Sequence, residues 1–345
     1  MRRREFLRVG AGLAAGQGLM AQGEAWVRPP SPSDPLIWGR TDGVVFGLAS
    51  AGGMPGPRGL IRVGIWNKST GQAELINFVA VEPVTFGHGS RQSRMGFSEL
   101  EKSQSDGLQG KRFSTPDPLV AVESLPARPQ PIERLSVRIE IEPFTVNGAH
   151  VYVIASVYSN RPREVVFSVH QHADSAPIEE LTLTATMGNY GRLRWLWLKD
   201  RVIDSRKLFA GHTGTGFIDK ENYPRDEMLS HGDGDALVLA SPNEANPASI
   251  SIVERPFWTY RSIKLTQYWR VPAYHIQPDL RVKVNGRGTY YGSAIPIPGG
   301  LAFENLEVRQ RYVAGQVFVF GLLPQEPWEL RPLIPRLGPK PDDSM

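Results

Sequence analysis

The chain of 345 residues contains no cysteine. This absence excludes a disulfide framework, a thiolate zinc or iron–sulfur site, a cysteine nucleophile and a lipid anchor on cysteine. Long helical patterns are missing too, because no segment sustains an apolar period of about 3.6 residues over more than a few turns. After the N-terminal region there is no run of about 18 apolar residues, so we expect no further membrane-spanning helix.

An excess of charge of one sign is also lacking. The chain has 39 Lys and Arg against 35 Asp and Glu, a formal charge of +4. Residues 1–25 hold four of these Arg and two Glu, so the remainder carries 35 basic against 33 acidic residues, or +2. A surface this balanced does not predict a nucleic-acid partner.

The first 25 residues, by contrast, have the features of an export signal. A basic head precedes a short segment rich in Gly and Ala, followed by small residues suited to a signal peptidase. The run R-R-E-F-L-R at residues 3–8 resembles the twin-arginine (Tat) motif at every position. This resemblance implies a Tat signal peptide at residues 1–25, passage through the Tat translocase, and a periplasmic or secreted mature chain without stable membrane insertion.

Most of the remaining sequence has the pattern of β-strands. Apolar and polar residues alternate with a period of two at 135–142 and again at 280–285. About fifteen such candidates lie between Val44 and Leu322, separated by Gly, Pro, Asn and Asp turns. The pattern predicts an all-β fold: a large antiparallel two-sheet sandwich, supersandwich-like, with at most short helices.

The distribution of prolines suggests where the domain boundaries lie. We expect one β-sandwich domain at residues 26–323 and a Pro-rich tail at 324–345, which contains six prolines. Five further prolines at 116–131 mark a sub-boundary. Two packed β-domains therefore stay open as the alternative to a single sandwich.

Two stretches resemble exported all-β proteins of glycan-degrading bacteria. They are T-A-T-M-G-N-Y-G-R-L-R at 184–194, and I-P-I-P-G-G at 295–300 with F-E-N at 303–305. The resemblance covers roughly residues 180–320 of the chain. It implies a glycan context, but that group has no assigned reaction and transfers no catalytic residue.

The histidines supply one set of candidate catalytic residues. His170, His172 and Asp174 are each two residues apart, so on an extended strand they share one face, as an acid–base or metal cluster requires. The spacing of the surrounding residues does not match the cupin metal pattern. We therefore predict no metal and no cofactor, and a polar strand end is the structural alternative.

A second set follows a glycine at a strand-to-strand junction. Asn189 and Arg192 could neutralise a substrate carboxylate, and Tyr190 could serve as a phenolic base, as in a β-eliminating polysaccharide lyase. The alternative is an ordinary turn. If the protein is an enzyme, we expect these three residues to share one catalytic site with His170 and His172.

Aromatic and hydrogen-bonding residues between positions 257 and 275 are candidates for substrate binding. Sugar rings stack on aromatic side chains, while amides and guanidinium groups reach the hydroxyls. The residues are Trp258, Tyr260, Gln267, Tyr268, Trp269 and Tyr274. Burial of these aromatics in the sandwich core is the alternative.

Glycosidase chemistry would require two carboxyl groups about 5 to 10 Å apart. Six glutamates qualify by position, and no pair among them stands out: Glu99, Glu101, Glu179, Glu180, Glu304 and Glu307. The sequence thus predicts an exported protein acting on polysaccharide or oligosaccharide, as a lyase or hydrolase. The alternative is a non-catalytic glycan-binding or envelope structural protein, and whether catalysis occurs stays open.

Overall fold

A computed structural model describes ten segments of the chain. They are residues 25–29, 36–48, 61–86, 94–96, 114–145, 147–186, 192–218, 221–243, 265–289 and 294–341. Besides strands, these segments contain the four-residue helix α2 (Ser205–Leu208) and the 3₁₀ turns η1 (Arg225–Glu227), η2 (Ala273–His275) and η3 (Pro327–Leu330). No helix in the described segments is long and apolar enough to cross a membrane. The predicted all-β fold class is confirmed.

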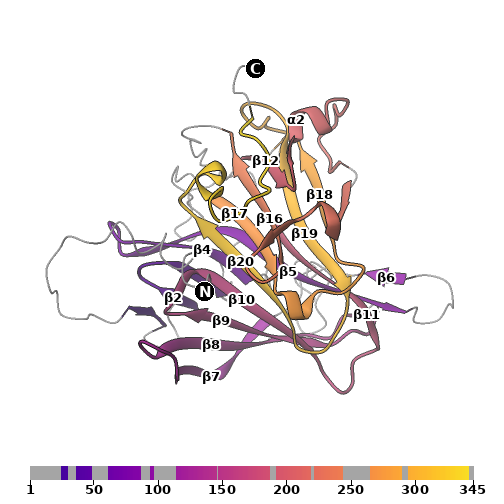
Figure 1. Ribbon diagram of the computed structural model, residues 1–345. Coiled ribbons are helices and arrows are strands. Elements are labelled where there is room, and N and C mark those ends of the chain that lie inside the picture. Colours follow the sequence, from indigo (N-terminus) through magenta and orange to yellow (C-terminus); the bar gives the residue numbers. More distant parts are fainter. Residues whose placement is uncertain are drawn as a thin grey trace, which may run out of the picture.

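Two antiparallel sheets of ten strands each make up the sandwich (Figure 1). Sheet A has the order β1-β2-β3-β4-β5-β11-β19-β18-β14, with β6 beside β5. Its strands are β1 (Trp26–Val27), β2 (Ile37–Arg40), β3 (Val44–Leu48), β4 (Ile61–Asn67), β5 (Gln72–Phe86), β6 (Arg94–Gly96), β11 (Ile178–Thr186), β14 (Glu221–Pro224), β18 (Arg281–Arg287) and β19 (Ala302–Arg311).

Sheet B has the order β13-β12-β16-β17-β20-β10-β9-β8-β7, with β15 beside β16. Its strands are β7 (Ser114–Leu125), β8 (Ile132–Ile141), β9 (Val151–Tyr158), β10 (Arg161–Gln171), β12 (Leu193–Leu198), β13 (Arg201–Asp204), β15 (Leu229–His231), β16 (Asp235–Pro242), β17 (Thr266–Val271) and β20 (Gln316–Leu323). Most paired strands are consecutive in the sequence, but the pairings β5–β11, β11–β19, β12–β16 and β10–β20 join distant segments.

One hydrophobic core fills the space between the sheets. The alternation at 135–142 buries Leu135, Val137, Ile139 and Ile141, as a half-buried strand requires. The same cluster extends from Trp38 to Leu322 and takes residues from both sheets. Strands β7 and β8 pair across the Pro-rich stretch 116–131, so its prolines do not separate two cores.

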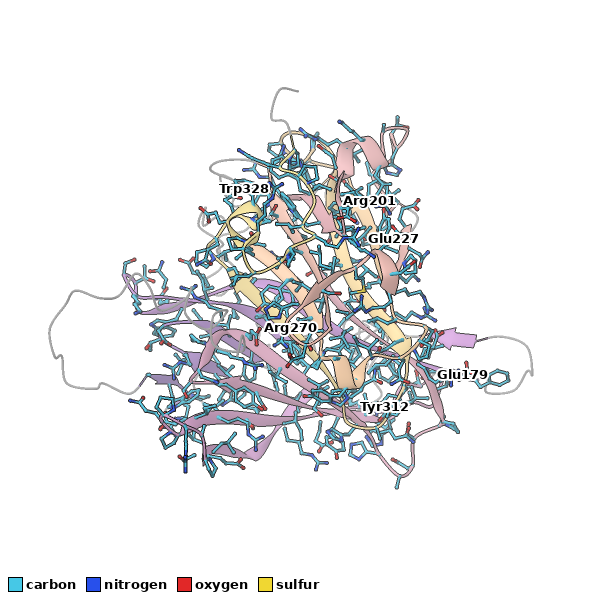
Figure 2. The ribbon with its side chains drawn as sticks, in the orientation of Figure 1. Glu179, Arg201, Glu227, Arg270, Tyr312 and Trp328 are labelled. Atoms are coloured by element: carbon cyan, nitrogen blue, oxygen red, sulfur yellow. The ribbon has the colours of Figure 1, made fainter. Side chains whose placement is uncertain are left out.

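The C-terminal tail packs on the outer face of sheet B. Trp195 and Trp197 of β12 point away from the main core, and tail residues Leu330, Ile334 and Leu337 cover them. Trp328, labelled in Figure 2, meets the Trp195 ring edge to face at a centroid distance of 6.3 Å. The described part of the tail therefore forms a third layer and belongs to the folded structure.

Candidate functional site

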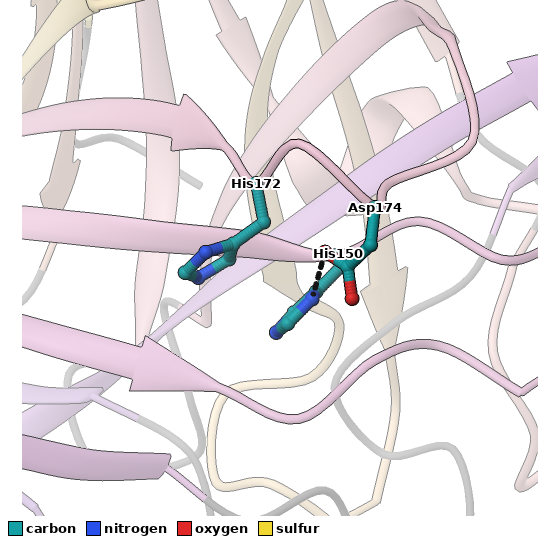
Figure 3. A group of neighbouring side chains, drawn as sticks. All are labelled: His150, His172 and Asp174. Atoms are coloured by element: carbon teal, nitrogen blue, oxygen red, sulfur yellow. Dashed lines mark hydrogen bonds and ion pairs between the residues drawn. The ribbon is translucent and has the colours of Figure 1, made fainter.

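His170 and His172 lie at the end of β10, where that strand pairs with β9. The register places His170 opposite Tyr152, and their rings stack at 4.9 Å. Further along, the His172 ring stacks on the His150 ring at 4.0 Å. Asp174 accepts a hydrogen bond from Nδ1 of His150 at 2.8 Å (Figure 3), which lowers the pKa of the Asp174 carboxyl. We call His150, His172 and Asp174 the histidine cluster.

Side chains of the neighbouring strand β8 hold this cluster in place. Glu140 Oε2 accepts a hydrogen bond from Nε2 of His172 at 2.8 Å, and Glu140 Oε1 accepts one from Arg138 at 2.5 Å. Burial, with the charge of Arg138 as the second cause, lowers the pKa of His170. Because both carboxylate oxygens of Glu140 are engaged, it orients His172.

Arg192 lies in a different part of sheet B from these histidines. It immediately precedes β12, which is four strand spacings from β10, or about 19 Å at about 4.8 Å per spacing. The registers of the intervening strands also place Arg192 level with the start of β10, whereas His172 follows its end. The structure therefore does not bring Arg192 and the histidines into one site, because too many strands separate them. Asn189 and Tyr190 lie outside the described residues.

A buried arginine, Arg194, fixes the segment that begins at Arg192. Arg192 is itself buried and has a positive φ of 42°. Two residues later, Arg194 is fully buried and donates hydrogen bonds to the carbonyls of Pro298 and Gly300 and to Asn243 Oδ1. Residues 192–194 therefore contact residues 298–300, so the ends of the two stretches singled out in the sequence meet in space.

Three of the predicted sugar-binding residues lie inside sheet B, with a packed layer on each side of their strand. Trp269 is 0% exposed, packs between the sheets, and donates from Nε1 to the carbonyl of Leu306. Gln267 and Tyr268 are 1% and 2% exposed. These predictions are corrected by the structure, because β17 lies in the middle of sheet B and is covered on both faces.

Of the remaining aromatic candidates, Tyr274 in the turn η2 is 80% exposed and its ring lies 4.4 Å from that of His275. Trp258 and Tyr260 lie outside the described residues. The exposed aromatic surface that the described segments offer in this region thus centres on Tyr274.

The polar partners near Tyr268 serve a buried ionic network. Tyr268 Oη donates to Glu164 Oε1 at 2.8 Å, and Arg270 donates to Glu164 Oε2 and to Asp235 Oδ2, each at 2.7 Å. Burial, followed by the charge of Glu164, raises the pKa of Tyr268 well above its usual value. The network fixes β10, β16 and β17 to one another on the side covered by the tail.

A different set of polar side chains lies on the face of sheet A that points away from the core. They come from β11, β18 and β19, and together with the adjoining bulge residue Glu304 we call them the polar face: Thr184, Lys283, Asn285, Arg287, Asn305 and Glu307. The register sets Glu307 opposite Thr184 on one side and Lys283 on the other. Thr184 Oγ1 is buried and has no hydrogen-bond partner among the described residues, although buried hydroxyls normally have one.

Glu304 is the extra residue of a β-bulge in the polar face. Asn285 pairs with Asn305 and Gly286 with Phe303, so no residue of β18 lies opposite Glu304. Residues three apart point to opposite faces of a regular strand, and the extra residue breaks this alternation, so Glu304 and Glu307 are not held to opposite faces. Glu304 is 5% exposed, and burial raises its pKa to about 7.

Arg287 supplies the positive charge that limits this rise in pKa. Its guanidinium is fixed by donation to the carbonyls of Thr215 at 3.0 Å and Thr289 at 3.3 Å, and it lies 4.6 Å from the centre of the Phe217 ring. Within the described residues Glu304 forms no salt bridge. A carboxyl with a pKa near 7 exchanges a proton readily at neutral pH, as general acid–base catalysis requires.

Glu180, another of the candidate glutamates, has its pKa shifted in the opposite direction. It is buried on β11, but Arg281 at 3.2 Å and Arg309 both form salt bridges with it. Burial raises the pKa of Glu180, and the two arginines outweigh that effect, so the result lies below the usual value. Glu99 and Glu101 lie outside the described residues.

No protein-family model matches this chain, and neither does any protein in a search of curated sequences.

Proposed function

We propose that the protein is exported and cleaves glycosidic bonds in a polysaccharide or oligosaccharide by hydrolysis, with the polar face of sheet A as its active site. The observation that carries the proposal is Glu304, a buried carboxyl with a pKa of about 7 at a β-bulge of β19, three residues before a second buried carboxyl, Glu307. Pairs of carboxyl groups in different environments are the working parts of glycosidases.

The two groups would divide the reaction between them. Glu304 in its protonated form donates a proton to the oxygen of the leaving sugar. Glu307, opposite Lys283 in the sheet, acts as the second carboxylate, which attacks the sugar or activates water. Three residues along a strand span about 10 Å, and the bulge shortens this, so the side chains can reach the separation of about 5 to 9.5 Å that glycosidases use.

Neighbouring side chains would position the sugar. Asn285 accepts a hydrogen bond from the backbone N–H of Asn305 at 3.0 Å, so its amide NH₂ group is the part that can donate to a hydroxyl. The buried Thr184 Oγ1 would gain its hydrogen bond from a ligand hydroxyl.

The test is a screen of plant, algal and bacterial polysaccharides with the purified protein, following both new reducing ends and the ultraviolet absorbance of unsaturated uronates. Hydrolysis gives reducing ends without that absorbance, whereas β-elimination gives both. We expect Glu304→Gln to lower kcat by about 10² to 10⁴, and the matched variant Glu179→Gln to retain activity. Full activity of Glu304→Gln on a cleaved substrate would refute the assignment.

A non-catalytic glycan-binding function is the second candidate, and the exposure of Tyr274 favours it. An exposed aromatic ring can stack on a sugar without any carboxyl group. Glycan binding that Tyr274→Ala abolishes and Glu304→Gln leaves unchanged, in a protein without cleavage activity, would select this alternative.

Export rests on the arginine pair near the N-terminus. Changing Arg3 and Arg4 to Lys should leave the precursor in the cytoplasm, as judged by cell fractionation. Normal export of that double variant would exclude the Tat route and leave the enzymatic part of the proposal standing.

A further inference from the structure

We propose that the histidine cluster at the end of β10 binds a divalent transition-metal ion of the zinc type. His150, His172 and Asp174 each offer one ligand atom, and these atoms all lie within 4.8 Å of one another. Two imidazoles and one carboxylate form a donor set that suits zinc and its first-row neighbours. The site is on sheet B and does not depend on the function proposed for sheet A.

His150 and Asp174 already bring two ligand atoms to the place where one ion could join them. Nδ1 and Oδ1 are 2.8 Å apart (Figure 3). Two ligands bound tetrahedrally to zinc at about 2.0 to 2.1 Å lie about 3.3 Å apart, so this pair would open by about half an ångström to hold an ion. A metal ion would therefore replace the proton that now joins these two atoms.

His172 completes the set through its hydrogen bond with Glu140. With Nε2 donating to the Glu140 carboxylate, the lone pair of His172 resides on Nδ1, which is the atom available to a metal. The imidazole rings of His150 and His172 now stack at an angle of 26°. Rotation about their Cβ–Cγ bonds would aim both nitrogens at one ion. Glu140 then has the role of the carboxylate that orients a ligating histidine in many zinc sites.

The backbone around the cluster is already fixed, so little ordering accompanies binding. His172 N–H donates to the carbonyl of His150 at 2.9 Å. His150 N–H donates to Ser175 Oγ at 2.9 Å, and Ser175 N–H donates to the carbonyl of His172 at 3.1 Å. These bonds tie the start of β9 to the turn that carries Asp174.

Solvent reaches the cluster, so an ion can enter and retain water. The side chains of His150, His172 and Asp174 are 20%, 23% and 70% exposed. Three protein ligands leave a position for water, which is the arrangement of catalytic rather than closed structural zinc sites. The sequence grouped His170 with His172 and Asp174. In the structure His170 instead stacks on Tyr152 and forms a hydrogen bond with Ser168 Oγ at 2.9 Å.

The test is titration of chelator-treated protein with Zn²⁺ by calorimetry, and with Co²⁺ by visible absorption. We expect one ion per chain, with affinity lowered at least tenfold by Asp174→Asn and by His172→Gln. Glu140→Gln should lower it about 10- to 100-fold, as expected for a group that orients a ligand. His275→Gln is the matched control, because His275 lies in the turn η2 outside the cluster, and it should bind as the wild type does.

Two results would overturn the site: no Zn²⁺ or Co²⁺ binding by the wild type, or binding that Asp174→Asn and His172→Gln leave unchanged. Thermal unfolding of the metal-free variants shows whether each one folds. Should a variant fail to fold, Co²⁺ binding to the wild type decides the matter, because paramagnetically shifted imidazole signals must come from two histidines. Signals from fewer than two would also refute the cluster.

Discussion

Glu164 on sheet B and Glu304 on sheet A are buried to almost the same extent, at 6% and 5% exposure, yet they lie in opposite electrostatic surroundings. Glu164 receives hydrogen bonds from Tyr268 and Arg270, and Arg161 lies 3.8 Å away. Glu304 has no salt bridge within the described residues, and its pKa rises to about 7. The difference shows that burial alone does not determine the role of a carboxyl group. Glu164, whose charge is balanced by arginines, joins strands, whereas Glu304, whose charge is not balanced by a salt bridge, retains a proton.

The largest effect should come from breaking the balanced side of this comparison. Arg270→Met leaves Glu164 and Asp235 without their shared guanidinium, and removing one partner of a buried ion pair costs about 3 to 5 kcal/mol. Urea unfolding measures the loss. The double variant Arg270→Met, Glu164→Gln should recover part of it, because no uncompensated charge remains at Glu164. A loss below about 1 kcal/mol in the single variant would show that water compensates Glu164.

The unbalanced side should give a stability change that depends on pH. The pKa of Glu304 is about 7 in the folded chain against an ordinary 4.5, so between these values the folded state binds more protons and wild-type stability falls as pH rises. Glu304→Gln lacks this loss. Its stability relative to the wild type should therefore increase by on the order of 3 kcal/mol between pH 4 and pH 8. Parallel pH profiles of the two proteins would contradict the raised pKa.

Glu180, also on sheet A, should change stability with pH in the opposite direction to Glu304. Its pKa is lowered in the folded chain, because Arg309 and Arg281 outweigh the effect of burial. Its contribution to stability is therefore present above the unfolded-state pKa and lost as pH falls through the folded-state value. Glu180→Gln should cost about 1.5 to 3 kcal/mol at pH 7, as expected for hydrogen bonds to a charged group, and progressively less in acid. Denaturant unfolding across the acid range gives this difference directly.

Local pattern was enough to predict the strands, but not which of their residues meet. The alternation at 135–142 is a property of one segment, and its apolar residues are all buried. His150 escaped the sequence analysis because its neighbour His172 belongs to another strand, so the pairing depends on the register of β9 against β10. Glu304 and Glu307 were both among the candidate glutamates, but the sequence did not single them out as a pair. Residues three apart lie on opposite faces of a regular strand, and the β-bulge at Glu304 has no sequence signature here.

The aromatic residues of β17 teach the same lesson from the other direction. Trp269 and Tyr268 have the composition of a sugar-binding surface, but β17 lies between β16 and β20 with a layer on each side. Composition reports what a side chain could contact. The order of strands in a sheet, which involves contacts between distant segments, decides what it does contact.

The smallest effect should come from a carboxylate that is paired but exposed. Asp200 and Arg336 form a salt bridge with side-chain exposures of 52% and 62%, and Asp200 N–H also donates to the carbonyl of Arg336 at 2.8 Å. Arg336→Ala removes the ion pair and keeps this backbone bond. Because water already solvates both charges, we expect a loss below about 1 kcal/mol, measured by urea unfolding beside Arg270→Met. If both variants cost the same, burial does not set the value of an ion pair in this protein, and the contrast between Glu164 and Glu304 loses its basis.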